Sequence, residues 1–157
     1  MSSFKSDFLR ESQQRGFIHQ GTDLEQLDAL MSKGSITAYL GFDMTARSLH
    51  VGSLLQIMWL KLLQKTGHTP IVLLGDGTTR IGDPSFKDES RPTLTDDEIE
   101  ANAAGISQIF ERYLNIGDRG NNARIVRNYS WLKGLDYPEL LATYGRHLTI
   151  NRMTSFD

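Results

Sequence analysis

His50 and Gly52 stand two residues apart where a short polar loop gives way to a long amphipathic segment, and the apolar run before that loop ends in Gly41 and Asp43. A helix start has unpaired N–H groups and the positive end of a dipole, so it suits an anion. His50 can donate a hydrogen bond to phosphate without a fixed charge, and Gly52 lets a base or phosphate approach the backbone. The pair predicts a nucleotide site; the simpler alternative is that His50 caps the helix or packs against it.

A second polar loop, residues 76–91, leaves the next strand and carries Asp83, Lys87 and Arg91. Ligands of open α/β sheets bind beyond the carboxyl ends of the strands, so the two loops should share one mouth. A carboxylate suits an ammonium and two cations suit polyphosphate, which together predict an amino acid beside ATP. The alternative is that Asp43 and Asp83 are turn residues and that Lys87 and Arg91 are solvated charges.

Other phosphate and metal motifs are absent from the sequence. There is no G-x-x-x-x-G-K-[ST] segment, and Gly75 and Gly77 lack the third glycine of a dinucleotide-binding turn. The four histidines are scattered and there is no cysteine, so we expect no metal site. The tripeptide Asn128-Tyr129-Ser130 matches the N-glycosylation acceptor pattern. We interpret this match as chance, because glycosylation requires secretion and the N-terminus does not resemble a secretion signal.

Composition favours a cytoplasmic globular protein. The chain has 157 residues, 39% hydrophobic and 23% charged, with a net charge of −2, so no overall basic field points to nucleic acid. The absence of cysteine fits the cytosol, and no apolar run approaches membrane-spanning length, so we expect no membrane partner.

Hydrophobic periodicity predicts the elements that must hold these loops. It predicts helices over residues 6–17, 23–34, 53–65 and 94–114, strands over 35–42, 71–76 and 123–128, and a long loop over 77–92. The segment 137–153 is expected to start as a helix, with Pro138 near its first turn. In the third helix we expect one buried face, made of Leu55, Met58, Trp59, Leu62 and Leu63. Thr95 and Glu98 predict a capping box at the start of the fourth helix, and Ile99, Ala103, Ile106 and Phe110 are expected to form its buried stripe.

This alternation of helices and strands predicts an α/β fold with parallel strands and right-handed crossovers. Three such strands make the first half of a Rossmann-like sheet with helices on both faces. We expect a helical segment over residues 1–35 and the N-terminal half of the Rossmann-like domain over 36–157. On this architecture the chain is expected to be truncated.

The segment His50-Val51-Gly52-Ser53 resembles the HIGH signature of class I aminoacyl-tRNA synthetases. Its surroundings resemble the bacterial tyrosyl-tRNA synthetases: "YLGFDMTARSLH" at 39–50 is similar to their Y-x-G-F-D-P-T-A-x-S-L-H, and "IGDPSFKDESR" at 81–91 to their I-G-D-P-S-G-K-x-x-x-R. "NYSW" at 128–131 and "GRHLTINRM" at 145–153 also fit that family, in the right order.

The resemblance implies a tyrosine–tRNA ligase, which activates L-tyrosine with ATP to tyrosyl-adenylate and passes the tyrosyl group to tRNA(Tyr). It implies ATP as co-substrate with Mg²⁺, no tightly bound cofactor, and a homodimer in the full-length protein. By the family pattern Tyr39 hydrogen-bonds the phenolic hydroxyl of tyrosine, and Asp83 holds its ammonium with Thr78 nearby and Asn128 in support.

On the nucleotide side the resemblance implies further roles. Contacts with ATP or its phosphates would come from Gly41, Asp43, Thr45, His50, Gly52, Ser53, Lys87 and Arg91. Among these, Thr45, His50, Lys87 and Arg91 would act on the polyphosphate as pyrophosphate leaves, and Gly52 would underlie the adenine.

Three residues depart from the family pattern. Ser53 replaces a histidine and can still donate a hydrogen bond and cap the helix; Met44 replaces a proline and should loosen the loop; Phe86 replaces a glycine. The family's Tyr-x-x-x-Gln-x-x-Asp helix and KMSKS loop are not in the sequence. The chain therefore carries half of one active site, with weak or no catalysis expected from it alone. The alternative is a non-catalytic nucleotide-binding or interaction module derived from the same fold.

Overall fold

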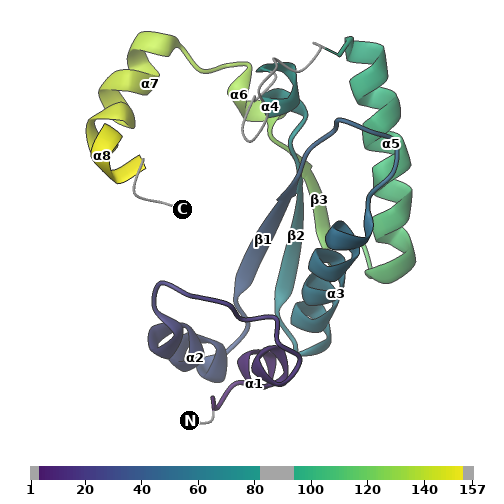
Figure 1. The fold of residues 1–157 in the computed structure, drawn as a ribbon, viewed down its shortest axis with the longest axis vertical. Helices are drawn as coiled ribbons and strands as arrows, with labels where there is room; N and C mark the ends of the chain where they lie inside the picture. Colours follow the sequence, from purple (N-terminus) through teal and green to yellow (C-terminus); the bar gives the residue numbers. More distant parts are fainter. Residues whose placement is uncertain (1–3, 82–93, 154–157) are drawn as a thin grey trace.

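The fold is known from a computed structural model, which describes residues 4–81 and 94–153 (Figure 1). The strands are β1 (Thr37–Phe42), β2 (Thr69–Leu74) and β3 (Arg124–Arg127). The helices are α1 (Asp7–Gln14), α2 (Leu24–Lys33), α3 (Val51–Lys65), α4 (Asp76–Ile81), α5 (Asp96–Tyr113), α6 (Tyr129–Leu132), α7 (Tyr137–Thr143), the 3₁₀ turn η1 (Gly145–His147) and α8 (Ile150–Met153).

The three strands form one parallel sheet in the order β1-β2-β3, as the alternation of elements predicts. Two backbone hydrogen bonds extend the pairing past the carboxyl ends of the strands. The N–H of Gly75 donates to the carbonyl of Phe42 at 2.8 Å, and the N–H of Asn128 donates to the carbonyl of Leu74 at 3.1 Å. The three segments that leave the strands are therefore held side by side at one edge.

Helices α3 and α5 cover one face of this sheet (Figure 1). α5 begins with the predicted capping box, because the Thr95 hydroxyl accepts from the N–H of Glu98 and the Glu98 carboxylate accepts from the N–H of Thr95. Its predicted buried stripe is confirmed in Ile99, Ala103, Ile106 and Phe110, all no more than 3% exposed. The Phe110 ring meets the Phe42 ring edge to face at 4.8 Å between centroids.

The opposite side of β1 is open. Thr37, Tyr39 and Gly41 alternate with the core-facing residues of the strand, and all three are exposed. β1 is also an edge strand of the sheet. A complete doubly wound sheet has helices on both faces, whereas in the described residues this side of β1 stays exposed.

Helices α1 and α2 build a second hydrophobic cluster against α3 at the amino ends of the strands. Its fully buried members are Phe8, Leu9, Met31, Leu62 and Leu63. Asp28 on α2 closes the start of α1 by accepting from the N–H groups of Lys5 and Ser6. Among residues 4–81 and 94–153, no helix is long and apolar enough to cross a membrane.

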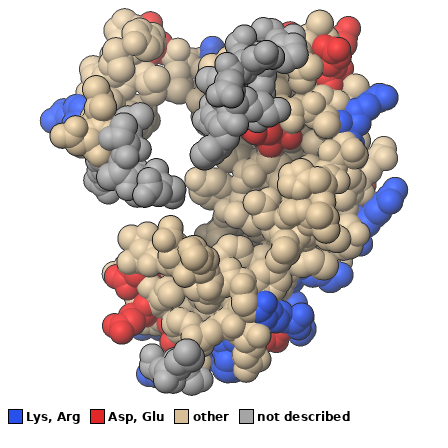
Figure 2. All heavy atoms as spheres, viewed as in Figure 1, with Lys and Arg blue, Asp and Glu red and all other residues tan. Residues whose placement is uncertain are grey.

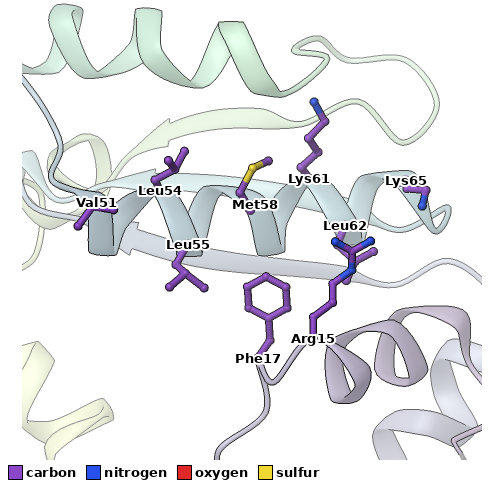
Figure 3. A pocket seen from close by; sticks show the side chains of 9 residues that line it. All are labelled: Arg15, Phe17, Val51, Leu54, Leu55, Met58, Lys61, Leu62 and Lys65. Carbon is purple, nitrogen blue, oxygen red and sulfur yellow. The ribbon is translucent and has the colours of Figure 1, made fainter.

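Helix α3 does not bury the single face that its sequence predicts. Leu62 and Leu63 are buried, whereas Leu55 is 57% exposed, and the contact with the sheet is made instead by Ile57 and Leu60. Because the helix packs against two partners, its buried surface turns from the sheet toward α1 along its length. Leu55 lies on the remaining side, where an open apolar groove runs along α3 beside Phe17 of the α1–α2 connection (Figure 3).

Two other predicted elements differ in the structure. The start of the predicted loop 77–92 is helical, because α4 spans Asp76–Ile81. The helix predicted to start at residue 137 is present but short: it is α7, with Pro138 in its first turn as expected, and η1 and α8 follow it. A short helix directly after β3, α6, has no counterpart in the prediction.

Candidate functional site

His50 and Gly52 form the start of α3. His50 is the N-cap, and its Nδ1 accepts a hydrogen bond from the N–H of Gly52 at 3.1 Å. A Cβ placed on residue 52 would lie 2.9 Å from His50 Cε1, so any other residue here would crowd the capping imidazole. The capping alternative for His50 is thus confirmed, and it explains the spacing of the two residues. Because Nδ1 is the acceptor, the neutral ring carries its proton on Nε2, which can donate outward.

The backbone donors at this helix start are largely in use. The N–H of Gly52 meets the imidazole, and the N–H groups of Ser53 and Leu54 both meet the carbonyl of His50. An anion arriving here would therefore meet His50 Nε2 before any free amide of these residues. Ser53 is 6% exposed and His50 occupies the cap, so the expectation that Ser53 caps the helix is wrong.

The loop between β1 and α3 is anchored rather than loose, so the expectation drawn from Met44 is also wrong. Met44 is fully buried; its N–H donates to Thr79 Oγ1 at 3.0 Å and its carbonyl accepts from Asn102 Nδ2 at 2.9 Å. A Cβ on Gly105 would lie 2.7 Å from the carbonyl oxygen of Arg47, so α5 also touches the loop closely. These contacts fix the path of the chain into His50.

The carboxyl ends of β1 and β2 bring Asp43 and Thr78 close to Gly75. A Cβ on Gly75 would lie 3.4 Å from Asp43 Oδ1 and 2.8 Å from Thr78 Oγ1. Gly41 faces open space, since no described atom lies within 4 Å of where its Cβ would be. Thr45 lies apart from them, in a shallow hollow over the first turns of α5.

Thr78 and Asn128, two residues that the resemblance joins on the tyrosine side, are in contact. Asn128 Oδ1 accepts from the N–H of Gly77 at 2.7 Å, and Asn128 Nδ2 donates to Thr78 Oγ1 at 3.3 Å. Asn128 is 7% exposed, whereas Thr78 is exposed at the edge of the sheet. Tyr39 lies farther back, in the middle of β1, with 66% of its surface exposed.

An ion-pair network built on one buried carboxylate adjoins these residues, and no sequence pattern predicted it. Asp76, 1% exposed, accepts from Arg127 Nε at 2.8 Å, and Arg127 also pairs with Glu100. Arg80 donates to the carbonyl of Asp76 and lies over the Tyr129 ring, 4.0 Å from its centroid. Burial alone would lower the pKa of Arg127, but its hydrogen bonds to Glu100 and Asp76 raise it. An acidic residue directly after a buried strand was the available signal.

Three of the predicted site residues, Asp83, Lys87 and Arg91, lie outside the described residues. Within the described part of the chain, no group of three or more histidine or acidic side chains is placed to hold a metal ion. Figure 2 shows Lys, Arg, Asp and Glu side chains spread around the drawn face, with uncharged residues over most of it.

Comparison with known proteins matches most of this chain. The family described as tRNA synthetases class I (W and Y) matches residues 31–157. The tyrosine–tRNA ligases of Rhodospirillum rubrum and Bartonella henselae are 58% and 59% identical over all 157 residues. The chain spans 38% of the length of each of these relatives.

Solved structures agree with the sequence matches. A C-terminally truncated mitochondrial tyrosyl-tRNA synthetase of Aspergillus nidulans superposes with a TM-score of 0.77 at 27% identity, covering 98% of this chain and 46% of that one. The corresponding protein of Coccidioides posadasii gives 0.76 at 25% identity, covering 98% of this chain and 44% of that one.

Proposed function

Because this chain belongs to the class I tRNA synthetase family of the tryptophan and tyrosine enzymes, we propose that it is the N-terminal part of the catalytic domain of a tyrosine–tRNA ligase. The proposed reaction has two steps. The carboxylate of L-tyrosine attacks the α-phosphorus of ATP, which gives tyrosyl-adenylate and releases pyrophosphate. A hydroxyl of the terminal ribose of tRNA(Tyr) then takes the tyrosyl group from the adenylate, which releases AMP.

One observation carries this proposal. Residues that the family resemblance assigns to both substrates come together at the carboxyl edge of one parallel sheet: Asp43 and Thr78 both lie close to Gly75, and Thr78 contacts Asn128. Ligands of open α/β sheets bind at this edge.

The nucleotide would lie at the start of α3. His50 Nε2 is the donor that the cap leaves for a phosphate oxygen, and we assign it, with Thr45, to the polyphosphate. Gly52 would underlie the adenine, with Ser53 beneath it, and Gly41 and Asp43 would line the adenylate. Lys87 and Arg91 complete this side in the proposal. Adenylate formation needs the reacting groups positioned and the growing charge on pyrophosphate met by donors, which suits these residue types.

The tyrosine would lie over β1 and β2. Tyr39 is assigned to its phenolic hydroxyl, and Asp83, Thr78 and Asn128 to its ammonium side. A site that hydrogen-bonds a substrate hydroxyl rejects the analogue without it by a large factor, because its own polar groups are then left unpaired; tyrosyl-tRNA synthetase is the standard case of this rule.

The remaining parts of the proposal concern the whole ligase. Mg²⁺ would arrive on the phosphates of ATP, as it usually does in phosphate-handling sites, and would supply charge neutralisation there. We propose a cytoplasmic homodimer that uses no tightly bound cofactor. Within this chain, residues 1–35 would form a helical segment and residues 36–157 the first half of the Rossmann-like domain.

The test is tyrosine-dependent exchange of labelled pyrophosphate into ATP by the complete polypeptide that carries residues 1–157. We expect exchange with tyrosine and far less with phenylalanine. Tyr39→Phe should narrow that preference, whereas Tyr137→Phe should not, although the two tyrosines are similarly exposed at 66% and 69%. Exchange that does not depend on tyrosine would overturn the proposal. ATP binding without any exchange would instead favour a non-catalytic nucleotide-binding or interaction module.

A further inference from the structure

Asp76 is a buried carboxylate to which the proposed reaction gives no role. It begins α4, directly beyond the carboxyl end of β2, and only 1% of it is exposed. Its Oδ1 accepts from the N–H of Tyr129 at 3.0 Å, and its Oδ2 accepts from Arg127 Nε at 2.8 Å. Both oxygens are occupied by donors of the β3–α6 segment, so this carboxylate joins two parts of the chain and is not directed at a substrate.

The two residues that Asp76 holds stand on either side of Asn128. Asn128 in turn reaches back to the two residues that follow Asp76: its Oδ1 accepts from the N–H of Gly77 at 2.7 Å, and its Nδ2 donates to Thr78 Oγ1 at 3.3 Å. Four hydrogen bonds thus clamp residues 76–78 to residues 127–129. α4 and α6 lie in contact as a result (Figure 1).

There is little spare room inside this clamp. A Cβ on Gly77 would lie 2.9 Å from Asn128 Oδ1 and 3.1 Å from the backbone of Tyr129. The Asn128 amide is therefore closely packed against residue 77 and is held there by its two hydrogen bonds.

The clamp determines what Thr78 can offer to a ligand. Its hydroxyl donates to the carbonyl of Gly75 at 3.0 Å and accepts from Asn128 Nδ2. A hydroxyl has one donor and two lone pairs, so a single acceptor site remains. An ammonium group, which only donates, fits that site.

We propose that Asp76 is a positioning residue for the amino-acid side of the site: with Arg127 it fixes Asn128, and through Asn128 it presents the Thr78 hydroxyl as an acceptor for the ammonium of the substrate. This inference rests on the proposed function for its substrate and on the described contacts for its mechanism. Asp76 itself touches no substrate.

Asp76→Asn tests the inference in the complete ligase. One amide oxygen can still accept from the N–H of Tyr129, but the amide nitrogen then faces the Arg127 donor, and the segment around Asn128 is released. We expect KM for tyrosine in pyrophosphate exchange to rise about tenfold, the order of one lost hydrogen bond to a charged group. KM for ATP should stay within about twofold, because none of the described residues proposed to contact ATP belongs to residues 76–78 or 127–129.

Glu100→Gln is the matched control. It removes the same unit of charge from the other partner of Arg127, and the Glu100 side chain is 66% exposed. It does not hold Tyr129, so KM for tyrosine should not change. Arg127→Lys keeps the positive charge but loses the Nε donor, and should act in the same direction as Asp76→Asn if that variant folds poorly.

A double variant separates positioning from general destabilisation. If Asp76 acts through Asn128, then Asp76→Asn adds no further rise in KM for tyrosine when Asn128→Ala is already present. Additive effects of the two changes, or equal rises in KM for tyrosine and for ATP, would overturn the inference.

Hydrogen exchange of the Asn128 side-chain amide gives a readout that does not depend on activity. We expect slow exchange in the wild-type chain and fast exchange in Asp76→Asn. An unchanged exchange rate refutes the clamp even in an active ligase. Absence of tyrosine-dependent activity in the wild type would instead refute the proposed function, and the amide exchange would still decide the clamp.

Discussion

His50 is the side chain in which folding and the proposed nucleotide contact can be separated by substitution. Its Nδ1 caps α3 through the N–H of Gly52, and its Nε2 is the proposed phosphate donor. His50→Ala removes both functions. His50→Asp keeps a strong capping acceptor and adds a negative charge at the positive end of the helix dipole, but it places a carboxylate where phosphate should bind.

The ranking of the two variants by stability should therefore differ from their ranking by activity. Loss of the cap in His50→Ala should cost about 1 kcal/mol of unfolding free energy. His50→Asp should equal or exceed the wild type, since a charge at a helix start contributes roughly 0.3–1 kcal/mol. Activity should fall in both, by about 10²-fold when a donor to the transition state is lost, and further in His50→Asp because the carboxylate repels polyphosphate.

Urea unfolding of each variant gives the stability order, and tyrosine-dependent pyrophosphate exchange in the complete ligase gives the activity order. His50→Asn, which keeps a capping oxygen and an amide donor, should fall between the wild type and His50→Asp in exchange. Wild-type exchange in His50→Asp would refute the phosphate role and leave His50 as a cap alone. Activities that simply follow stability across the three variants would refute it as well.

Three further predictions follow from the packing and from one buried histidine. Gly77→Ala should lower the free energy of unfolding in urea by about 1–3 kcal/mol, because the added methyl group overpacks the contact with α6. Gly41→Ala is the control and should leave stability unchanged, because its Cβ would meet open space. Equal losses in the two variants would contradict close packing at Gly77. Ile57→Ala should lower the free energy of unfolding by about 2–5 kcal/mol and Leu55→Ala by much less, since Ile57 is 1% exposed and Leu55 57% exposed. A larger loss of stability for Leu55→Ala than for Ile57→Ala would show that the groove along α3 is covered in solution. Burial lowers the pKa of His68 below its usual 6.5, so as the pH falls His68 binds a proton in the unfolded protein before it does so in the folded one. The urea midpoint should therefore decrease as the pH is lowered from about pH 6.5. His68→Gln should lack this contribution to the pH dependence of stability.

The elements that the local sequence pattern predicts correctly are those stabilised mainly by their own residues. α5 has a reciprocal capping box and a buried stripe at helical spacing, and both are present as expected. β2 is a β-branched and leucine-rich run between turn residues, and it is the central strand of the sheet. In these segments the interactions that determine the conformation join residues close in the sequence, so hydrophobic periodicity predicts the elements.

The segments that were predicted wrongly are those whose conformation depends on residues distant in the sequence. α4 contains one glycine and two threonines among its six residues and has no apolar pattern; its first residue is fixed by Arg127, 51 positions away. Leu55 has the spacing of a buried residue, but the direction of a helix face depends on what packs against it, and α3 has different partners along its length. The tyrosine-side pair Thr78–Asn128 came from the family resemblance, because no spacing rule connects residues 50 positions apart.

Met44 shows why a departure from a family pattern has to be judged by the contacts of the new residue. Proline at this position would have no N–H, whereas Met44 donates its N–H to Thr79 Oγ1 and accepts from Asn102 at its carbonyl. Its side chain is fully buried in the core formed by α3, α5 and the sheet. What proline supplies by a fixed φ angle, this chain supplies by burial and two hydrogen bonds. The bond to Thr79 also connects the loop that leads to His50 with α4, which carries Thr78. The proposed nucleotide and amino-acid sides of the site are therefore positioned against each other through the backbone of one buried residue.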